Sequence, residues 1–344
     1  EPPTLVMGQD NLEENEANRR GLVGSGSLFF PAGICSGDDQ HVFVADKDNH
    51  RVLIWKKIPF SDGWNADISL GQPGMDERDA NRGDFENVQQ DTLSFPTGVF
   101  YDVENDKVFV VDQGNNRVLI WNSLPRDTGQ PADVVIGQKD FVSRSPNMGK
   151  GENRASQDSM YFPRDVIAGK MGLFVSDSGN NRVLYWKEIP AENGQPADMV
   201  FGQANFFDNR YNRNGTASAS TLNDPYGLWL EEEENPEWTP PEESALEKTQ
   251  EEETLDESSP EEGAEEDTAE EEIPEYLFKL FIADRGNSRV VVWNELPVPS
   301  KEEDEYKDDQ IEVEDPNLLI GEDEDDYSVD EEDEDGSPEE LPSA

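Results

Sequence analysis

The sequence predicts an all-β fold made of four copies of one unit, and three observations carry that prediction. First, one fourteen-residue stretch recurs in similar form at 42–55, 108–121, 173–186 and 280–293. Second, its aspartate recurs at intervals of 66, 65 and 107 residues, and the excess of the last interval is close to the length of an acidic run. Third, no amphipathic helical period of about ten residues or more separates the copies. Four short antiparallel strands per unit, repeated at a fixed period, indicate the blades of a β-propeller.

The four strands of one unit can be read in the second copy. Residues 97–103 (TGVFYDV) are a short apolar run and predict the first strand. The tight-turn composition Glu-Asn-Asp separates this run from the second strand, 107–112 (KVFVVD). The next turn, QGNN, contains Gly and Asn, which tolerate positive φ, and leads to the third strand at 117–122. A polar loop with Pro and Gly precedes the fourth strand at 133–138.

Other markers keep the same period and set the boundaries. A Gly-Gln pair ends the fourth strand of the first three units, and an earlier pair, Gly8-Gln9, ends an extra N-terminal strand over 4–9. A last candidate fourth strand is 317–322. We therefore predict one propeller over 1–322, with blades at about 28–72, 93–138, 160–203 and 222–322. Three closures remain open: a four-blade ring, an open arc associated with further blades, or half of a homodimer.

Two acidic segments carry most of the charge. The chain has 79 acidic and 27 basic residues, for a net charge of −52. Residues 231–276 and 302–344 each hold 22 acidic residues and one lysine, so the remainder is only mildly acidic. Both segments contain few apolar residues and are predicted to be disordered. The first replaces the turn between the first two strands of the last blade, and the second provides an acidic loop and C-terminal tail.

The composition also excludes several function classes. Such acidity argues against binding to nucleic acid, which needs clustered Lys and Arg, and against anionic membranes. No apolar run of about 18 residues is present, so no transmembrane helix is expected. A single cysteine, Cys35, excludes an intrachain disulfide and a cysteine-based metal site. The two histidines, His41 and His50, are too few for a histidine-rich metal centre, and no G-x-S-x-G is present.

The unit resembles the NHL repeat, whose motif joins P-x-G-[IV] to V-[YF]-V-[AV]-D-x-x-N-x-R-[IV]. All four copies match the core of the second element, with Ser176 replacing Ala in one. The resemblance covers roughly 1–230 and 277–322, and it implies the propeller fold without implying one activity, because propellers host many. The units here depart from the family in length, since they are near 65 residues rather than about 40–45. The excess lies after the fourth strand, at 73–92, 139–160 and 204–220.

The D-x-x-N-x-R motif itself can be interpreted as a metal or ligand site, or as a structural turn. The structural interpretation is favoured because the same residues occur in every unit, whether or not that unit meets a ligand. In this interpretation the aspartate accepts backbone N–H groups, the asparagine adopts a left-handed conformation, and the arginine pairs with an aspartate. The residues concerned are Asp46, Asn49, Arg51, Asp112, Asn115, Arg117, Asp177, Asn180, Arg182, Asp284, Asn287 and Arg289.

We therefore expect a non-enzymatic binding or scaffold module. Its binding surface is predicted on the face of the long loops, with Phe141, Tyr161, Phe206, Phe207 and Tyr211 as binding residues and with a protein or glycan as partner. No catalytic residue, no metal ligand and no cofactor is assigned, although calcium stays open. The acidic segments would serve solubility or capture basic partners. Two alternatives remain: a carboxylate- and calcium-dependent hydrolase or lyase, and a low-affinity calcium-binding protein. An extracellular or periplasmic location is expected from the non-methionine start and the family resemblance.

Overall fold

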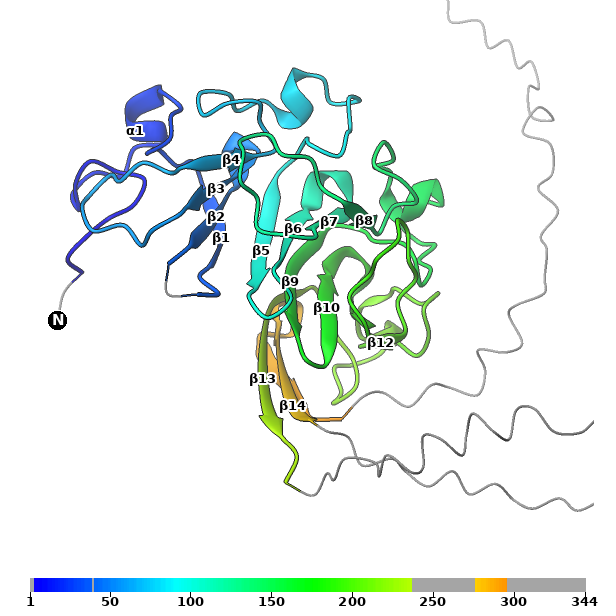
Figure 1. Cartoon of the computed structure of the whole chain (residues 1–344). Coiled ribbons are helices and arrows are strands. Elements are labelled where there is room, and N and C mark those ends of the chain that lie inside the picture. The colour runs from blue at the N-terminus through cyan, green and yellow to red at the C-terminus, as the bar shows by residue number, and fades with distance from the viewer. Residues whose placement is uncertain (1–2, 39, 237–275, 296–344) are drawn as a thin grey trace, which may run out of the picture. The chain divides into compact units, whose positions relative to one another are not determined.

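The computed structural model describes residues 3–38, 40–236 and 276–295 and shows four antiparallel sheets (Figure 1). Each sheet follows chain order. The first contains β1 (Pro31–Cys35), β2 (Val42–Asp46), β3 (Arg51–Trp55) and β4 (Ile68–Leu70). The second contains β5 (Pro96–Asp102), β6 (Lys107–Asp112), β7 (Arg117–Trp121) and β8 (Val134–Ile136). The third contains β9 (Pro163–Gly169), β10 (Gly172–Asp177), β11 (Arg182–Trp186) and β12 (Met199–Phe201). The fourth contains β13 (Pro225–Glu234), β14 (Tyr276–Asp284) and β15 (Arg289–Trp293).

Successive sheets pack face to face, as the blades of a propeller do. Their first strands contact one another in chain order, β1 with β5, β5 with β9, and β9 with β13. A separate apolar cluster fills each space between neighbouring sheets. Alternate residues of each strand point to opposite faces, so the inner strands of the second and third sheets are apolar on both sides and pack on two neighbouring sheets. The four sheets are therefore one repeated packing unit, in agreement with the predicted β-propeller class.

The recurring stretch forms the hairpin of the second and third strands in every sheet. In the second sheet Val108 pairs with Trp121 and Asp112 pairs with Arg117, and the other sheets keep the same register. Each turn contains one 3-10 turn: η1 (Lys47–Asn49), η3 (Gln113–Asn115), η5 (Ser178–Asn180) and η7 (Arg285–Asn287). The next residue takes the left-handed conformation, with φ of 53° at Asn116. Positive φ thus occurs within this turn, but the prediction that the motif asparagine adopts it was wrong. Asn115 ends the 3-10 turn η3, and the left-handed residue is the one that follows it.

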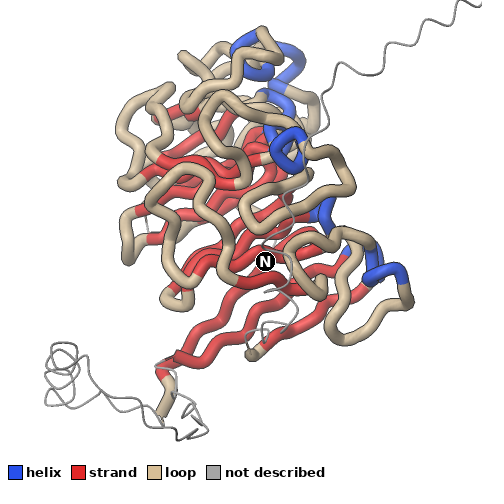
Figure 2. Tube along the Cα trace, turned by 90° about the vertical axis from the view of Figure 1, so that its right-hand side faces the viewer, coloured by secondary structure: helices blue, strands red, loops and turns tan. Residues whose placement is uncertain are grey.

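The long segment that precedes each sheet carries a short helical turn on the same side as the hairpin turns (Figure 2). These turns are α1 (Asn18–Gly21), η2 (Ala80–Gly83), η4 (Pro146–Gly149) and η6 (Tyr211–Asn214). All four contain at least two successive non-glycine residues with positive φ, which backbone sterics disfavour. Such a conformation persists only where surrounding contacts hold it.

The extra strand predicted over 4–9 is not a strand. Residues 3–6 have no regular structure and residues 7–10 form a bend. The segment nevertheless lies against the first sheet, where Met7 packs beside a cluster that includes Trp55. A strand requires a hydrogen-bonded neighbour, and no described residue provides one on the side where a third strand would lie.

The fourth sheet corrects the predicted start of the acidic insertion, which we placed at 231–276. Residues 231–234 belong to β13 and pair with residues 276–279 of β14. The physical reason is a contact with the neighbouring sheet. Glu232 accepts hydrogen bonds from the backbone N–H groups of Lys170 (3.0 Å) and Met171 (2.7 Å) in the third sheet.

The remainder of the acidic insertion, the segment 302–344 and the candidate strand 317–322 lie outside the described residues. The predictions made for them are therefore not examined by the structure. Within the described ranges, no helix has the length and apolar character needed to cross a membrane.

Candidate binding surface on the long-loop face

The turn motif forms a buried hydrogen-bond network, seen most completely in the second sheet. Asp112 Oδ1 accepts the backbone N–H of Ser94 at 2.7 Å. Asp112 Oδ2 accepts Asn115 Nδ2 at 2.7 Å and Arg117 Nε at 2.8 Å. Both side chains of the Asp112–Arg117 pair are wholly buried. Burial raises the pKa of Asp112, and the adjacent Arg117 charge and the hydrogen bonds oppose that shift.

The arginine of the motif joins the hairpin to two long loops. Arg117 donates to the carbonyl of Phe141 (2.6 Å) in the following loop, and to those of Gln89 (2.8 Å) and Thr92 (3.0 Å) in the preceding loop. Arg51 and Arg182 make the corresponding bonds in their own sheets. The guanidinium donors are therefore consumed within the scaffold, so these arginines offer nothing to a ligand.

An asparagine in each long loop completes this network, and the sequence analysis missed it. Asn81 and Asn115 exchange two amide hydrogen bonds, at 3.1 and 2.9 Å. The same reciprocal pair joins Asn18 to Asn49, Asn147 to Asn180, and Asn212 to Asn287. The signal was available, because the four loop asparagines recur close to the 65-residue period and three of them precede arginine.

The Gly-Gln marker has a structural role as well. Gly137 has φ of 84°, and a Cβ there would lie 2.7 Å from the sulfur of Met160, so only glycine fits. Gln138 Nε2 donates to the carbonyls of Asn116 (3.1 Å) and Ser145 (2.9 Å), which links the fourth strand to the hairpin turn and the long loop. Gln72 and Gln203 make equivalent bonds.

The structure separates the five predicted binding residues into two groups. Phe206 is buried in the cluster between the second and third sheets, and Phe141 is partly buried against the neighbouring cluster. Tyr161 is half-buried; its backbone N–H donates to Asp177, and its ring contacts Phe162. Phe207 and Tyr211 are exposed, by 53% and 61%. Of the five, these two side chains are the most accessible to a ligand.

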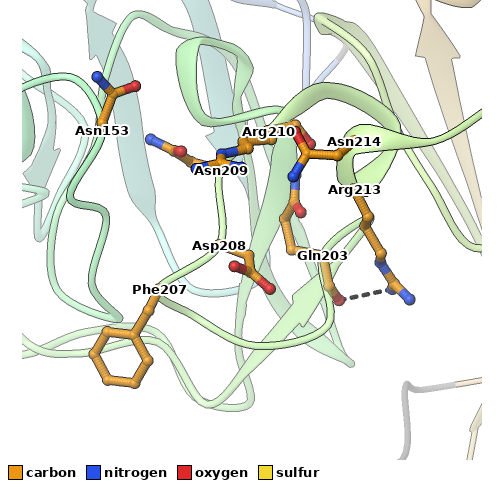
Figure 3. Close-up of a pocket in the computed structure, with 8 residues that line it drawn as sticks. All are labelled: Asn153, Gln203, Phe207, Asp208, Asn209, Arg210, Arg213 and Asn214. Atoms are coloured by element: carbon orange, nitrogen blue, oxygen red, sulfur yellow. Dashed lines mark hydrogen bonds between the residues drawn. The ribbon is translucent and has the colours of Figure 1, made fainter.

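A cavity of about 260 Å³ lies beside Phe207 on this face (Figure 3). It is lined by Asn153, Gln203, Phe207, Asp208, Asn209, Arg210, Arg213 and Asn214. Asn153 comes from the loop between β8 and β9, and the other seven come from the loop between β12 and β13. Two successive long loops therefore build one pocket, which is mostly polar and has one aromatic ring at its side.

The charged residues of this cavity differ in what they can offer a ligand. Arg213 donates to the carbonyls of Gln203 (2.8 Å) and Ser220 (3.1 Å), and partial burial lowers its pKa. Arg210 and Asp208, like Arg213, are exposed, but their side chains make fewer bonds to the loop. The backbone carbonyl of Arg210 accepts a bond from Gln203, and Asp208 accepts one from Asn205 at 3.3 Å. Arg213 therefore shapes the loop, while Arg210 and Asp208 present charge of both signs at the surface.

The alternative of a carboxylate- and calcium-dependent enzyme would need several acidic side chains that converge on one point. Asp165 of β9 stands where the other units have Gly33, Gly98 and Gly227. Its two oxygens accept the backbone N–H groups of Val166 and Leu228, both at 2.9 Å, and burial raises its pKa to about 6. Within the described ranges, no group of three or more His, Cys, Asp or Glu side chains is placed to hold a metal ion.

Comparisons with known proteins agree with this architecture. The family model described as NHL repeat matches residues 30–55, which span β1, β2 and β3. The comparison with curated protein sequences found no match.

Among solved structures, glutaminyl cyclase of Myxococcus xanthus is 11% identical, covers 48% of this chain and 53% of its own, and has a TM-score of 0.26. The matched chain of a nidogen/laminin complex is 15% identical; the match covers 46% of this chain and 60% of that chain, with a TM-score of 0.23. Virginiamycin B lyase of Staphylococcus aureus is 12% identical; the match covers 81% of this chain and 88% of that chain, with a TM-score of 0.25. The chain thus spans little more than half the length of the first two. At these TM-scores the likenesses support no statement about function.

The matched segment 30–55 contains the hairpin whose register and hydrogen bonds recur in the other three sheets. The four units therefore share the same first three strands, while the described part of the fourth sheet has no fourth strand. The NHL repeat model therefore matches the first of four similar units, and the sheets built by these units are arranged as the blades of a β-propeller.

Proposed function

We propose that this protein is a non-enzymatic binding module whose ligand, a protein or a glycan, occupies the long-loop face around the cavity beside Phe207. One observation carries the proposal. The polar side chains of the repeated motif are consumed by the scaffold, whereas Phe207, Arg210 and Asp208 of one long loop stay exposed beside a cavity. Exposed side chains on loops that a rigid sheet scaffold positions are the usual arrangement of a binding site.

The chemistry of the cavity suits recognition rather than bond cleavage. An aromatic ring beside amide groups and charges of both signs can stack on an apolar ligand face and hydrogen-bond its polar groups. Sugars and extended peptides both present such surfaces. No histidine or cysteine lines the cavity. The cavity therefore has no imidazole to act as a general base at neutral pH and no thiol to act as a nucleophile.

The proposal can be tested by screening the full chain against a glycan array and a random peptide library, then measuring the affinity of each hit. Phe207→Ala and Arg210→Ala should each weaken the hit by about tenfold or more, which corresponds to about 1.4 kcal/mol. Phe60→Ala is the matched control, because Phe60 is an exposed phenylalanine in the loop between β3 and β4. Unchanged affinity in both cavity variants would contradict the assignment of this surface, and absence of any hit would count against a binding module.

The acidic segments extend the same proposal. Solubility, or the capture of a basic partner, is the role we propose for the residues of 237–275 and 302–344, which lie outside the described ranges. Binding of a basic protein through these residues would weaken with increasing salt concentration, because exposed charges are screened.

A further inference from the structure

The fourth sheet leaves open a face that is covered in the other three. Val290 and Val292 of β15 are 63% and 51% exposed. Their counterparts in the first three sheets, Val52, Ile54, Val118, Ile120, Val183 and Tyr185, are at most 1% exposed, because the next sheet covers them. An apolar strand face of this kind normally packs against a partner.

A hydrogen bond that links successive sheets is also missing at this end. His50 Nδ1 accepts the backbone N–H of Phe95 at 3.0 Å, and Asn116 Oδ1 accepts that of Phe162 at 2.9 Å. Asn181 Oδ1 does the same for Asp224 at 2.8 Å. The fourth turn has Ser288 at this position, whose hydroxyl can accept such a bond. Among the described residues no following sheet offers the N–H.

Gly227, in the first strand of the fourth sheet, also lacks the close neighbour that its counterparts have. A Cβ on Gly33 would lie 2.4 Å from the carbonyl oxygen of Thr97, and one on Gly98 would lie 2.9 Å from the Cα of Asp165. These glycines let the backbone of the next sheet approach closely. Gly227 holds this position in the fourth sheet, where the nearest atoms would be 3.9 Å away. Gly227 therefore has room for a neighbour that the described part of the chain does not supply.

At the first sheet, residues 4–9 lie where the fourth strand of a preceding sheet would lie. Gly63 donates to Val6 O at 3.0 Å, and Val6 donates to Asp62 Oδ1 at 2.8 Å. Ser69 of β4 makes the same two bonds with the loop of the second sheet, and Val135 of β8 makes them with the loop of the third. Residues 4–9 thus occupy the place of a fourth strand from a preceding sheet, but no third strand lies beside them among the described residues.

Ile34 marks the uncovered part of this first-sheet end. It is 70% exposed, whereas Val99 and Val166, its counterparts, are 5% and 2% exposed because the preceding sheet covers them. The chain therefore ends its row of described sheets with a third strand that lacks a fourth, and begins it with a fourth strand that lacks a third.

We propose that a second copy of this chain joins the two ends, so that the first sheet of one copy packs on the fourth sheet of the other. Residues 4–9 of the second copy would then complete the fourth sheet beside β15. The register of the other sheets, where Val52 faces Leu70 and Ile54 faces Ile68, places Val290 opposite Met7 and Val292 opposite Leu5. Ser288 of one copy would accept the backbone N–H of Phe30 of the other.

The contact is continuous with an interface that the chain already forms three times between its own sheets. Two copies joined at both ends make a closed two-fold ring of eight blades, within the usual range of about four to eight. Within the described part of one chain the two ends do not cover each other, since Ile34 and Val290 are both exposed. The disulfide test below separates closure by a second copy from closure of one chain on itself. This inference is independent of the proposed ligand surface, which lies in the loops between β8 and β9 and between β12 and β13.

The first test is the mass of the full chain in solution over a dilution series. We expect twice the 38.6 kDa of one chain. Val290→Asp and Ile34→Asp, at opposite ends, should each abolish the pair. An equimolar mixture of the two variants should regain a two-chain species, because one intact contact remains between them. Val142→Asp, at an exposed apolar residue in the loop after β8, is the matched control and should stay paired. A one-chain mass at every concentration, or a mass above two chains, would overturn the proposal.

A disulfide test distinguishes three segments that could pair with β15: residues 4–9 of a second copy, residues 4–9 of the same chain, and residues 317–322. In a Cys35→Ala background, the double variant Leu5→Cys/Val292→Cys should form bonds between chains under oxidising conditions, since the two Cα atoms would face each other across paired strands. A bond within one chain would show closure of the chain on itself. A bond within one chain in Val292→Cys/Leu318→Cys would instead assign the edge to residues 317–322. Either intrachain result would overturn the proposal.

Discussion

Asn81 of the second long loop and Asn115 of the second hairpin turn hold each other through two amide hydrogen bonds, at 3.1 and 2.9 Å. Both side chains are wholly buried. Asn115 also donates to Asp112, so the pair connects the long loop to the Asp112–Arg117 ion pair. The repeated motif and the long loops are therefore one structural unit.

Asn81→Ala should destabilise the fold by about 1–3 kcal/mol, because it leaves the Asn115 amide buried without its partner. The left-handed backbone at Asn81, with φ of 48°, adds about 1 kcal/mol for alanine. Asn81→Gly removes the amide without that strain. Its loss of unfolding free energy, measured by chemical denaturation, should therefore be smaller than that of Asn81→Ala. Asn153→Ala, at an exposed asparagine, is the control. Equal losses for alanine and glycine would show that backbone conformation is unimportant there.

Arg117→Lys should cost roughly 2–3 kcal/mol, because lysine keeps the charge but cannot donate in several directions from one planar group. Arg289 is the matched control. It makes the same bond to Asp284, at 2.6 Å, but its side chain is 29% exposed. Water can replace the lost contacts there, so Arg289→Lys should cost less than about 1 kcal/mol. Guanidinium denaturation of both variants checks this, and a larger loss at Arg289 would contradict it.

Asp165 should make the protein less stable as pH rises from about 4 to about 6. Burial raises its pKa from 3.8 to about 6, so in this window the folded state holds a proton that the unfolded state has released. The effect is bounded by about 3 kcal/mol, from a shift of about two units. Asp165→Asn removes this titration. The difference in unfolding free energy between variant and parent should therefore shift in favour of the variant across the window and stay constant above it. A difference independent of pH would contradict the assignment.

Glu232→Gln should lower stability by about 0.5–1.5 kcal/mol, since the N–H groups of Lys170 and Met171 bind different oxygens of the carboxylate, and glutamine replaces one of these oxygens with an NH2 group that cannot accept a hydrogen bond. Glu233→Gln changes the neighbouring, exposed residue of the same strand and should leave the thermal midpoint unchanged. Equal effects at the two positions would mean that the loss comes from net charge rather than from the contact.

The sequence alone was sufficient to predict the strands of one blade and their order. The recurrence of D-x-x-N-x-R, the apolar alternation on either side and the turn residues predicted the β6–β7 hairpin and the order of the four strands, because these depend on neighbours along the chain. The loop asparagines were missed although they keep the same period, since nothing local distinguishes a buried amide pair from a polar loop residue.

The tertiary structure decided which aromatic side chains a ligand can reach. Phe206 and Phe207 are adjacent and chemically identical, yet one is 7% exposed and the other 53% exposed. The structure also decided that Glu231–Glu234 continue a strand, and that residues 4–9 occupy a strand position without forming one. The physical reason is common to these cases. Local propensity and periodicity specify each hairpin, whereas exposure and strand pairing depend on which other sheet, or which other copy of the chain, lies alongside.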